Sequence, residues 1–333
     1  MSAKKLDPNS VWVGFDLGGT KMLATVFDDT FRVLGRRRKR TQGSKGADEG
    51  LERIITTIRD ALEDAKVDTE SLLGIGVGSA GPLNPQKGIL LDAPNLGWTR
   101  VKIGQHLRET FHCPVILAND VDAGVYGEYR FGAGQKASTV VGIFPGTGIG
   151  GGCVINNEIL MGKSRSCMEI GHIPVMPNGP LCGCGQRGCL EAVGSRLAIA
   201  AAAAAAAYRG EAPNLLAKAG TEISEIRSGV IAAAIADGDK VVEEIVRNAA
   251  RWVGIGVATL VNLMAPQVVV LGGGLVEALP DLYVEEVTAA AASRVMTPYR
   301  KTFHIRIAEL GDDAVVQGAA AWAQHQVLGS AHV

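Results

Sequence analysis

Apolar residues follow two patterns along the chain, and together they predict alternating strands and helices. Short apolar runs that end at turn residues predict strands at residues 11–15, 22–27, 33–41, 73–77, 114–117, 138–144, 268–271 and 303–308. Helical spacing or strong helix formers predict helices at residues 48–66, 103–111, 194–208, 228–236, 240–264 and 313–326, and others that start near residues 123 and 280. This alternation is typical of an α/β fold.

Two glycine-rich turns each connect one predicted strand to the next. The first is Asp16-Leu17-Gly18-Gly19-Thr20-Lys21, and the second contains Gly146-Thr147-Gly148. Backbone N–H groups, threonine hydroxyls and a lysine suit phosphate oxygens, so we predict two phosphate loops and not mere tight turns. Neither is a P-loop or a dinucleotide fingerprint, because a strand follows where those motifs need a helix. The repeat predicts two α/β lobes, with ATP between the two hairpins and Mg²⁺ at Asp16.

A polar pair, Asn119-Asp120, follows the strand predicted at residues 114–117. Ligands gather at the carboxyl ends of parallel strands in α/β sheets. A phosphoryl-transfer enzyme needs a carboxylate there to accept the proton of the attacking hydroxyl, and Asp120 suits that role. Asp122 is the second choice, because a helix is predicted to start near residue 123 and Asp122 then suits an N-cap or a first-turn acid.

Three cysteines lie among glycines in residues 182–189, and a histidine precedes them at position 172. Three thiolates and one imidazole form a closed, four-coordinate set for structural zinc, here Cys182, Cys184, Cys189 and His172. The alternative is that they are small buried residues or disulfide partners, but the other cysteines are scattered and no signal peptide precedes them. Glu169 and Glu191 bracket the loop, and we expect both carboxylates to face one pocket for a polyhydroxyl ligand.

Composition narrows the class of protein. The chain has 333 residues, of which 47% are hydrophobic, and a net charge of −1, as expected of two soluble domains with no electrostatic reason to bind nucleic acid. No apolar run is long enough to span a membrane, and the polar N-terminus lacks a signal sequence, which predicts a cytoplasmic protein. Five consecutive cations at residues 36–40 are interpreted as a solvated edge strand rather than a nucleic-acid or polyphosphate contact.

One long signature resembles a known family. Glu169-Ile170-Gly171-His172, followed by Cys182-Gly183-Cys184-Gly185-Gln186-Arg187-Gly188-Cys189-Leu190-Glu191, is similar to the motif of the ROK family, which contains sugar kinases and sugar-responsive repressors. The resemblance implies a two-lobed, actin-like ATPase (ribonuclease H-like) fold with a ligand cleft between the lobes and a zinc-binding loop. The implied lobes are residues 11–120 with 312–330, and residues 121–311.

The same resemblance implies an ATP-dependent hexose kinase that acts on the 6-hydroxyl, most similar to the family's glucokinases. Asp120 is the implied catalytic base. The implied sugar contacts are Gly81, Asn95, Asn119, Asp120, Glu169, His172 and Glu191. The implied contacts to ATP and Mg²⁺ are Asp16, Gly18, Gly19, Thr20, Lys21, Gly146, Thr147, Gly148, Gly272, Gly273 and Gly274.

Several alternatives stay open at this point. Cys167-Met168 replaces the small residues that family kinases carry before the first glutamate, so N-acetylglucosamine, N-acetylmannosamine, mannose or fructose compete with glucose as substrate. Polyphosphate competes with ATP as phosphoryl donor. A repressor is disfavoured because about ten polar residues stand where those proteins carry a DNA-binding module, and the zinc signature disfavours an actin-like or Hsp70-like ATPase. Family analogy suggests a homodimer or homotetramer.

Overall fold

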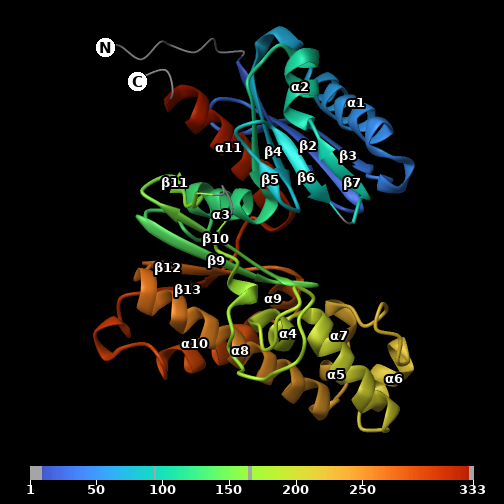
Figure 1. The fold of residues 1–333 in the computed structure, drawn as a ribbon, viewed down its shortest axis with the longest axis vertical. Helices are drawn as coiled ribbons and strands as arrows, with labels where there is room; N and C mark the ends of the chain where they lie inside the picture. Colours follow the sequence, from blue (N-terminus) through green and yellow to red (C-terminus); the bar gives the residue numbers. More distant parts are fainter. Residues whose placement is uncertain (1–9, 94, 164–166, 330–333) are drawn as a thin grey trace. The chain divides into compact units, whose positions relative to one another are not determined.

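The computed structural model describes residues 10–93, 95–163 and 167–329, and it divides into two compact units. The first unit contains the described residues up to Gln135, those within 159–167 and those from Asp312 onward. The second contains Lys136–Glu158 and Met168–Gly311. Each unit is built around a five-stranded mixed sheet (Figure 1).

The sheet of the first unit has the order β3-β2-β1-β4-β8. Three antiparallel strands come first in the chain, β1 (Val11–Leu17), β2 (Lys21–Phe27) and β3 (Val33–Arg40). β4 (Leu72–Ser79) and β8 (Val115–Asn119) continue the sheet parallel to β1. The strands match the predicted apolar runs because both faces of the sheet are covered by helices.

Helix α1 (Ala47–Ala65) covers one face of this sheet with the predicted apolar stripe, in which Ile54, Ile58 and Leu62 are buried. Helix α11 (Ala314–Gly329) covers the other face, where Val316 and Ala320 pack with the buried residues Trp12, Leu23 and Phe27 (Figure 1).

Helix α11 lies unusually close to the sheet and to helix α3 (Asp120–Phe131). A Cβ atom at Gly14 would lie 1.9 Å from the Val316 carbonyl oxygen, and one at Gly318 would lie 1.7 Å from that of Ala123. Only glycine permits such backbone contacts. Because α3 packs on α11, it belongs to the first unit, whereas the predicted boundary at residue 120 assigned it to the second lobe.

A small antiparallel sheet completes the first unit where a loop was predicted over residues 91–98. It consists of β5 (Leu83–Asn84), β6 (Ile89–Ala93) and β7 (Trp98–Val101), with helix α2 (Ile103–Phe111) after it. The Trp98 indole N–H donates to the Gly43 carbonyl (3.1 Å) beside α1. This contact anchors the first residue of β7, three residues after Asn95.

The sheet of the second unit, β11-β10-β9-β12-β13, repeats the arrangement of the first. β9 (Thr139–Pro145) and β10 (Ile149–Ile155) form an antiparallel hairpin, with β11 (Glu158–Ile159) at the edge. β12 (Val268–Leu271) and β13 (His304–Ile307) run parallel to β9. The predicted duplication of a glycine hairpin on a mixed sheet is therefore present.

The helices of the second unit are α4 (Leu190–Gly194), α5 (Arg196–Tyr208), α6 (Pro213–Ala219), α7 (Ser228–Ala236), α8 (Lys240–Met264), α9 (Gly274–Ala278) and α10 (Pro280–Ala292). Helix α6 was not predicted. The helix predicted at residues 194–208 is α5, which begins at Arg196. Ser195 is its N-cap, and the Ser195 hydroxyl accepts from the Ala198 N–H (3.2 Å). None of the helices in the described ranges is long and apolar enough to cross a membrane.

The basic run at residues 36–40 occupies the edge strand β3, as predicted, but three of its cations are ion-paired. Arg36 pairs with Asp313, and Arg38 with Asp312 (2.8 Å), both just before α11. Lys39 pairs with Asp60 of α1 (2.7 Å) on the opposite face. These exposed pairs each contribute little, but they tie the sheet edge to helices on both faces.

Candidate active site and metal centre

The carboxyl ends of β1, β4 and β8 lie side by side in the first unit. The strand register aligns Asp16 of β1 with Gly78 of β4, and Ser79 of β4 with Asn119 of β8. A Cβ atom at Gly78 would lie 3.7 Å from the Asp120 Cα atom. The two carboxyl groups predicted for Mg²⁺ binding and catalysis, Asp16 and Asp120, are thus brought to the same edge of the sheet.

Asp120 is the first residue of α3, and Asn119 is the N-cap. The side-chain oxygens of both Asn119 and Asp120 accept from the Val121 N–H, each at 2.9 Å. Of the two roles predicted for Asp122, N-cap or first-turn acid, the structure shows the second: Asn119 is the N-cap, and Asp122 is a buried first-turn acid. Since the Asn119 oxygen caps the helix, its NH₂ group is the part suited to donate to a ligand.

Burial raises the pKa of both carboxyl groups. For Asp120 burial is the main cause, and it outweighs the lowering effect of the backbone N–H groups. For Asp16, burial followed by the negative charges of Asp120 and Asp312 raises the pKa from 3.8 to about 7. A divalent cation at Asp16 would favour the ionised form and so lower this pKa.

Replacing Asp16 with asparagine is expected to stabilise the ligand-free protein at pH 8. The unfolded chain ionises Asp16 near its ordinary pKa, whereas the folded protein keeps the proton until about pH 7. The native carboxyl therefore lowers the free energy of unfolding as pH rises between these values. Asp16→Asn should raise the free energy of unfolding by roughly 1–4 kcal/mol at pH 8 and by less at pH 5. Denaturant unfolding at both pH values measures the difference.

Asp28 offers the matched control for this measurement. Although burial opposes it, hydrogen bonds from Thr30 and Arg32 hold the pKa of Asp28 below its ordinary value. Asp28→Asn should therefore destabilise the protein at pH 8, opposite in sign to Asp16→Asn. An Asp16→Asn variant that is less stable than wild type at pH 8 would contradict the expectation.

Two hydrogen bonds hold the first glycine hairpin, one within the turn and one from Thr41, after β3. The Gly18 N–H donates to the Lys21 carbonyl (3.1 Å), and the Thr41 hydroxyl donates to the Gly18 carbonyl (2.7 Å). Gly19, Thr20 and Lys21 are exposed at the tip. The hairpin therefore presents its N–H groups and its lysine to solvent, as a phosphate loop requires.

A cavity of about 130 Å³ adjoins this hairpin within the first unit, and three of its lining residues were predicted to bind ligands. It is lined by Leu17, Gly19, Ala80, Gly81, Ala93, Asn95 and Leu96. Gly81 has φ +96°, and a Cβ atom there would lie 2.3 Å from the Asp92 carbonyl oxygen. Gly19 of the phosphate loop and the predicted sugar contacts Gly81 and Asn95 therefore meet at one cavity.

The second glycine hairpin has a neighbour that the sequence did not reveal. The backbone N–H of Arg196 donates to the Gly146 carbonyl (2.8 Å), and its guanidinium donates to the Thr147 hydroxyl (2.7 Å). Arg196 opens an alanine-rich helix and belongs to no motif, so no local signal marked it. The structure places an arginine directly on the predicted phosphate loop, and guanidinium groups are well suited to phosphate oxygens.

The three-glycine turn at residues 272–274 meets the same hairpin. The Gly272 N–H donates to the Ile143 carbonyl (3.2 Å). Gly273 has φ +85°, and a Cβ atom there would lie 2.9 Å from the Pro145 carbonyl oxygen. The contacts predicted for ATP in the second unit, residues 146–148 and 272–274, therefore lie together.

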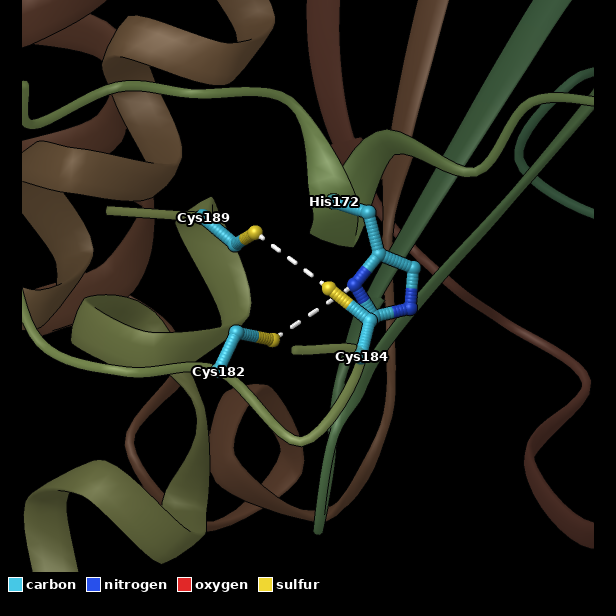
Figure 2. A group of neighbouring side chains, drawn as sticks. All are labelled: His172, Cys182, Cys184 and Cys189. Carbon is cyan, nitrogen blue, oxygen red and sulfur yellow. Dashed lines mark hydrogen bonds between the residues drawn. The ribbon is translucent and has the colours of Figure 1, made fainter. Parts of the chain in front are cut away.

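Figure 2 shows the four predicted metal ligands converging, with His172 in η3 (Ile170–His172) and the cysteines on the glycine-rich loop. The ligand atoms of His172, Cys182, Cys184 and Cys189 all lie within 4.8 Å of one another. His172 Nδ1 is 3.6 Å from Cys182 Sγ, and the sulfurs of Cys184 and Cys189 are 3.7 Å apart. Tetrahedral zinc with Zn–S bonds of 2.3 Å separates two sulfurs by about 3.8 Å, so the donor set fits this ion.

The loop backbone explains why glycines accompany the cysteines. Gly185 and Gly188 have φ +88° and +73°, and a Cβ atom at Gly188 would lie 1.8 Å from the Met176 carbonyl oxygen.

A hydrogen bond from the Gln186 N–H lowers the pKa of Cys184, whereas burial raises the pKa of Cys189 to about 12. Binding a metal would therefore release protons, because the ligand form of cysteine is the thiolate.

Glu191 follows the last cysteine and reaches in two directions. Its Oε1 atom accepts from the Cys182 thiol (3.7 Å), and its Oε2 atom accepts from the Ile149 N–H (3.0 Å) at the start of β10. A Cβ atom at Gly148 would lie 2.2 Å from Oε2. The predicted sugar contact therefore also contacts the second phosphate loop, while the prediction that Glu169 and Glu191 face one pocket stays a prediction.

Two mixed sheets of identical strand order, each with a glycine hairpin, define a two-lobed α/β protein with an actin-like ATPase fold. The ROK family matches residues 12–326. A glucokinase from Streptomyces coelicolor is 33% identical over 92% of this chain and 96% of its own. A ROK family glucokinase from Streptomyces griseus, solved in complex with glucose and AMPPNP, is 32% identical with a TM-score of 0.79, over 95% of this chain and 100% of that one.

Repressors are also among the relatives. A xylose repressor from Caldicellulosiruptor bescii is 27% identical over 93% of this chain and 77% of its own. The match to the family over nearly the whole chain shows that this protein belongs to the ROK family, as its signature predicted.

Proposed function

We propose that the protein is an ATP-dependent hexose kinase that phosphorylates the 6-hydroxyl group, with glucose as the first candidate substrate. The observation that carries the proposal is the pair of partly buried carboxyl groups, Asp16 and Asp120, at the carboxyl ends of β1 and β8. The Streptomyces griseus relative binds glucose and AMPPNP, which supports the same ligands here.

In the proposed reaction, Asp120 accepts the proton of the 6-hydroxyl group while that oxygen attacks the γ-phosphorus of ATP. The bond from this phosphorus to the β,γ-bridging oxygen breaks, and ADP leaves. A base with a raised pKa is suited to this step, because its pKa lies nearer to the working pH. Lys21 and Arg196 contribute positive charge at the two phosphate loops, and loop N–H groups donate to the phosphate oxygens. Asp16 would hold Mg²⁺, which neutralises charge on the phosphates when bound.

We assign the sugar to the donors and acceptors predicted from the sequence. The proposed contacts are Gly81, Asn95, Asn119, Asp120, Glu169, His172 and Glu191. Zn²⁺ at His172 and the three cysteines would be structural, since four protein ligands leave no position for water.

The Cys167 thiol donates to the Leu160 carbonyl (2.8 Å), and Met168 has φ +62°. This constrained backbone immediately precedes Glu169, a proposed sugar contact. We therefore expect Glu169 to set the sugar preference.

A panel of sugars tests the proposal. Purified protein with Mg²⁺ and ATP should phosphorylate glucose in a coupled assay with the highest kcat/KM, compared with mannose, fructose, N-acetylglucosamine and N-acetylmannosamine. ATP turnover without sugar should be slower by at least about 10²-fold, because a hexokinase-type site excludes water until sugar binds. Equal turnover with and without every sugar would favour a simple ATPase. Replacing ATP with polyphosphate in the same assay identifies the donor.

A sugar-responsive repressor is the second candidate, since xylose repressors are among the relatives. A gel shift with genomic DNA fragments, with and without sugar, tests it. Sugar-dependent DNA binding together with no phosphorylation of any sugar would replace the kinase assignment.

A further inference from the structure

Glu191 contacts two parts of the second unit that have separate roles in the proposed reaction, the metal cluster and the second phosphate loop. It lies two residues after the metal ligand Cys189, and its Oε1 atom accepts from the thiol of a second ligand, Cys182 (3.7 Å). Its Oε2 atom accepts from the Ile149 N–H (3.0 Å). One carboxylate therefore contacts both the metal cluster and the second phosphate loop.

The second phosphate loop is held at both of its ends from this region. Ile149 follows the loop and donates to Glu191 Oε2, while Gly146 opens the loop and accepts from the Arg196 N–H (2.8 Å). The Glu191 carbonyl in turn accepts from the Ser195 N–H (3.2 Å), next to Arg196. Both anchors of the loop thus depend on the short segment that follows Cys189.

Gly148 shows how closely the carboxylate fits the loop. A Cβ atom there would lie 2.2 Å from Glu191 Oε2 and 3.1 Å from Cδ. Any side chain at position 148 would displace the carboxylate or the loop. The requirement for glycine at this position is thus explained by Glu191 as well as by phosphate access.

We infer that Glu191 is a positioning residue for the nucleotide, which links the conformation of the metal loop to that of the second phosphate loop. Metal binding turns the Cys182 thiol into a thiolate, which no longer donates to Oε1. The metal therefore fixes Glu191 through Cys189, two residues before it, and Glu191 fixes the Ile149 end of the loop. Nucleotide affinity should therefore depend on the metal even without sugar. This inference rests on the proposed function, because it requires that the loop bind a nucleotide.

The test is the affinity of the sugar-free protein for Mg²⁺–AMPPNP, measured by calorimetry on metal-loaded and chelator-treated samples. Wild type should bind about tenfold more tightly when loaded, the worth of about one hydrogen bond to a charged acceptor. Glu191→Ala should bind like stripped wild type in both states, and Glu191→Gln should be intermediate. Glu169→Ala is the matched control, since it removes the other predicted sugar carboxylate.

The outcomes separate this inference from the proposed function. Wild type that binds no AMPPNP would overturn the kinase proposal. If wild type binds AMPPNP and metal-loaded Glu191→Ala binds it equally tightly, only the role of Glu191 is overturned. Loss of affinity in Glu169→Ala equal to that in Glu191→Ala would also count against it.

Two further readouts do not depend on catalysis. Hydrogen exchange in the peptide spanning residues 146–152 should be faster in Glu191→Ala than in wild type, because the Ile149 amide loses its acceptor. Gly148→Ala should weaken AMPPNP binding more in wild type than in Glu191→Ala, because the clash disappears with the carboxylate. Unchanged exchange, or additive effects of the two substitutions, would overturn the inference.

Discussion

Asp120→Asn is expected to lower kcat by about 10²–10⁴-fold while sugar affinity changes little, because asparagine keeps the size of the side chain but cannot accept the hydroxyl proton. Asn119 still caps α3 through its own oxygen, so the fold should persist. Steady-state kinetics with the best sugar measure kcat, and calorimetry measures sugar binding.

Asp122→Asn is the control for this substitution. Asp122 lies in the same first turn of α3 and is buried, yet it is not the proposed base. If Asp122→Asn removes turnover while Asp120→Asn keeps it, the base has been misassigned. The wild-type rate should also fall as pH drops through the raised pKa of Asp120, since only the ionised carboxylate accepts a proton.

Cys189→Ser is expected to remove the bound metal and to lower the melting temperature by roughly 10 °C, because a structural metal contributes directly to folding. Sugar binding should weaken as well, since His172 belongs to the cluster and Glu169 and Glu191 bracket it in the sequence. Elemental analysis for zinc, thermal unfolding and sugar calorimetry report the three effects.

Cys113→Ala serves as the control, because Cys113 is a buried cysteine of the first unit outside the cluster. It should keep full metal content. Wild-type protein that is purified with no metal, and whose stability does not respond to added Zn²⁺, would contradict the assignment of this cluster as a metal site.

Much of the fold could be predicted because its signals are local. Apolar runs bounded by glycine predicted the principal strands of both five-stranded sheets, and helices 103–111, 228–236 and 240–264 have the predicted bounds. The cluster of His172 with three cysteines could be predicted because close spacing among glycines leaves few ways to place three thiols. The small sheet β5–β7 was missed, since its strands are short and rich in turn residues.

The sequence by itself determined most of the elements, the two glycine hairpins, the cysteine–histidine cluster and the family, because each depends on residues that are near one another in the chain or on a long spaced motif. Only the tertiary structure decided that α3 packs with α11, that Asn119 rather than Asp122 caps α3, and that Arg196 and Glu191 contact the second glycine hairpin. It also brought Asp16 beside Asp120. These relations join residues that are distant in sequence or depend on side-chain direction, so strand register and packing decide them rather than any local pattern.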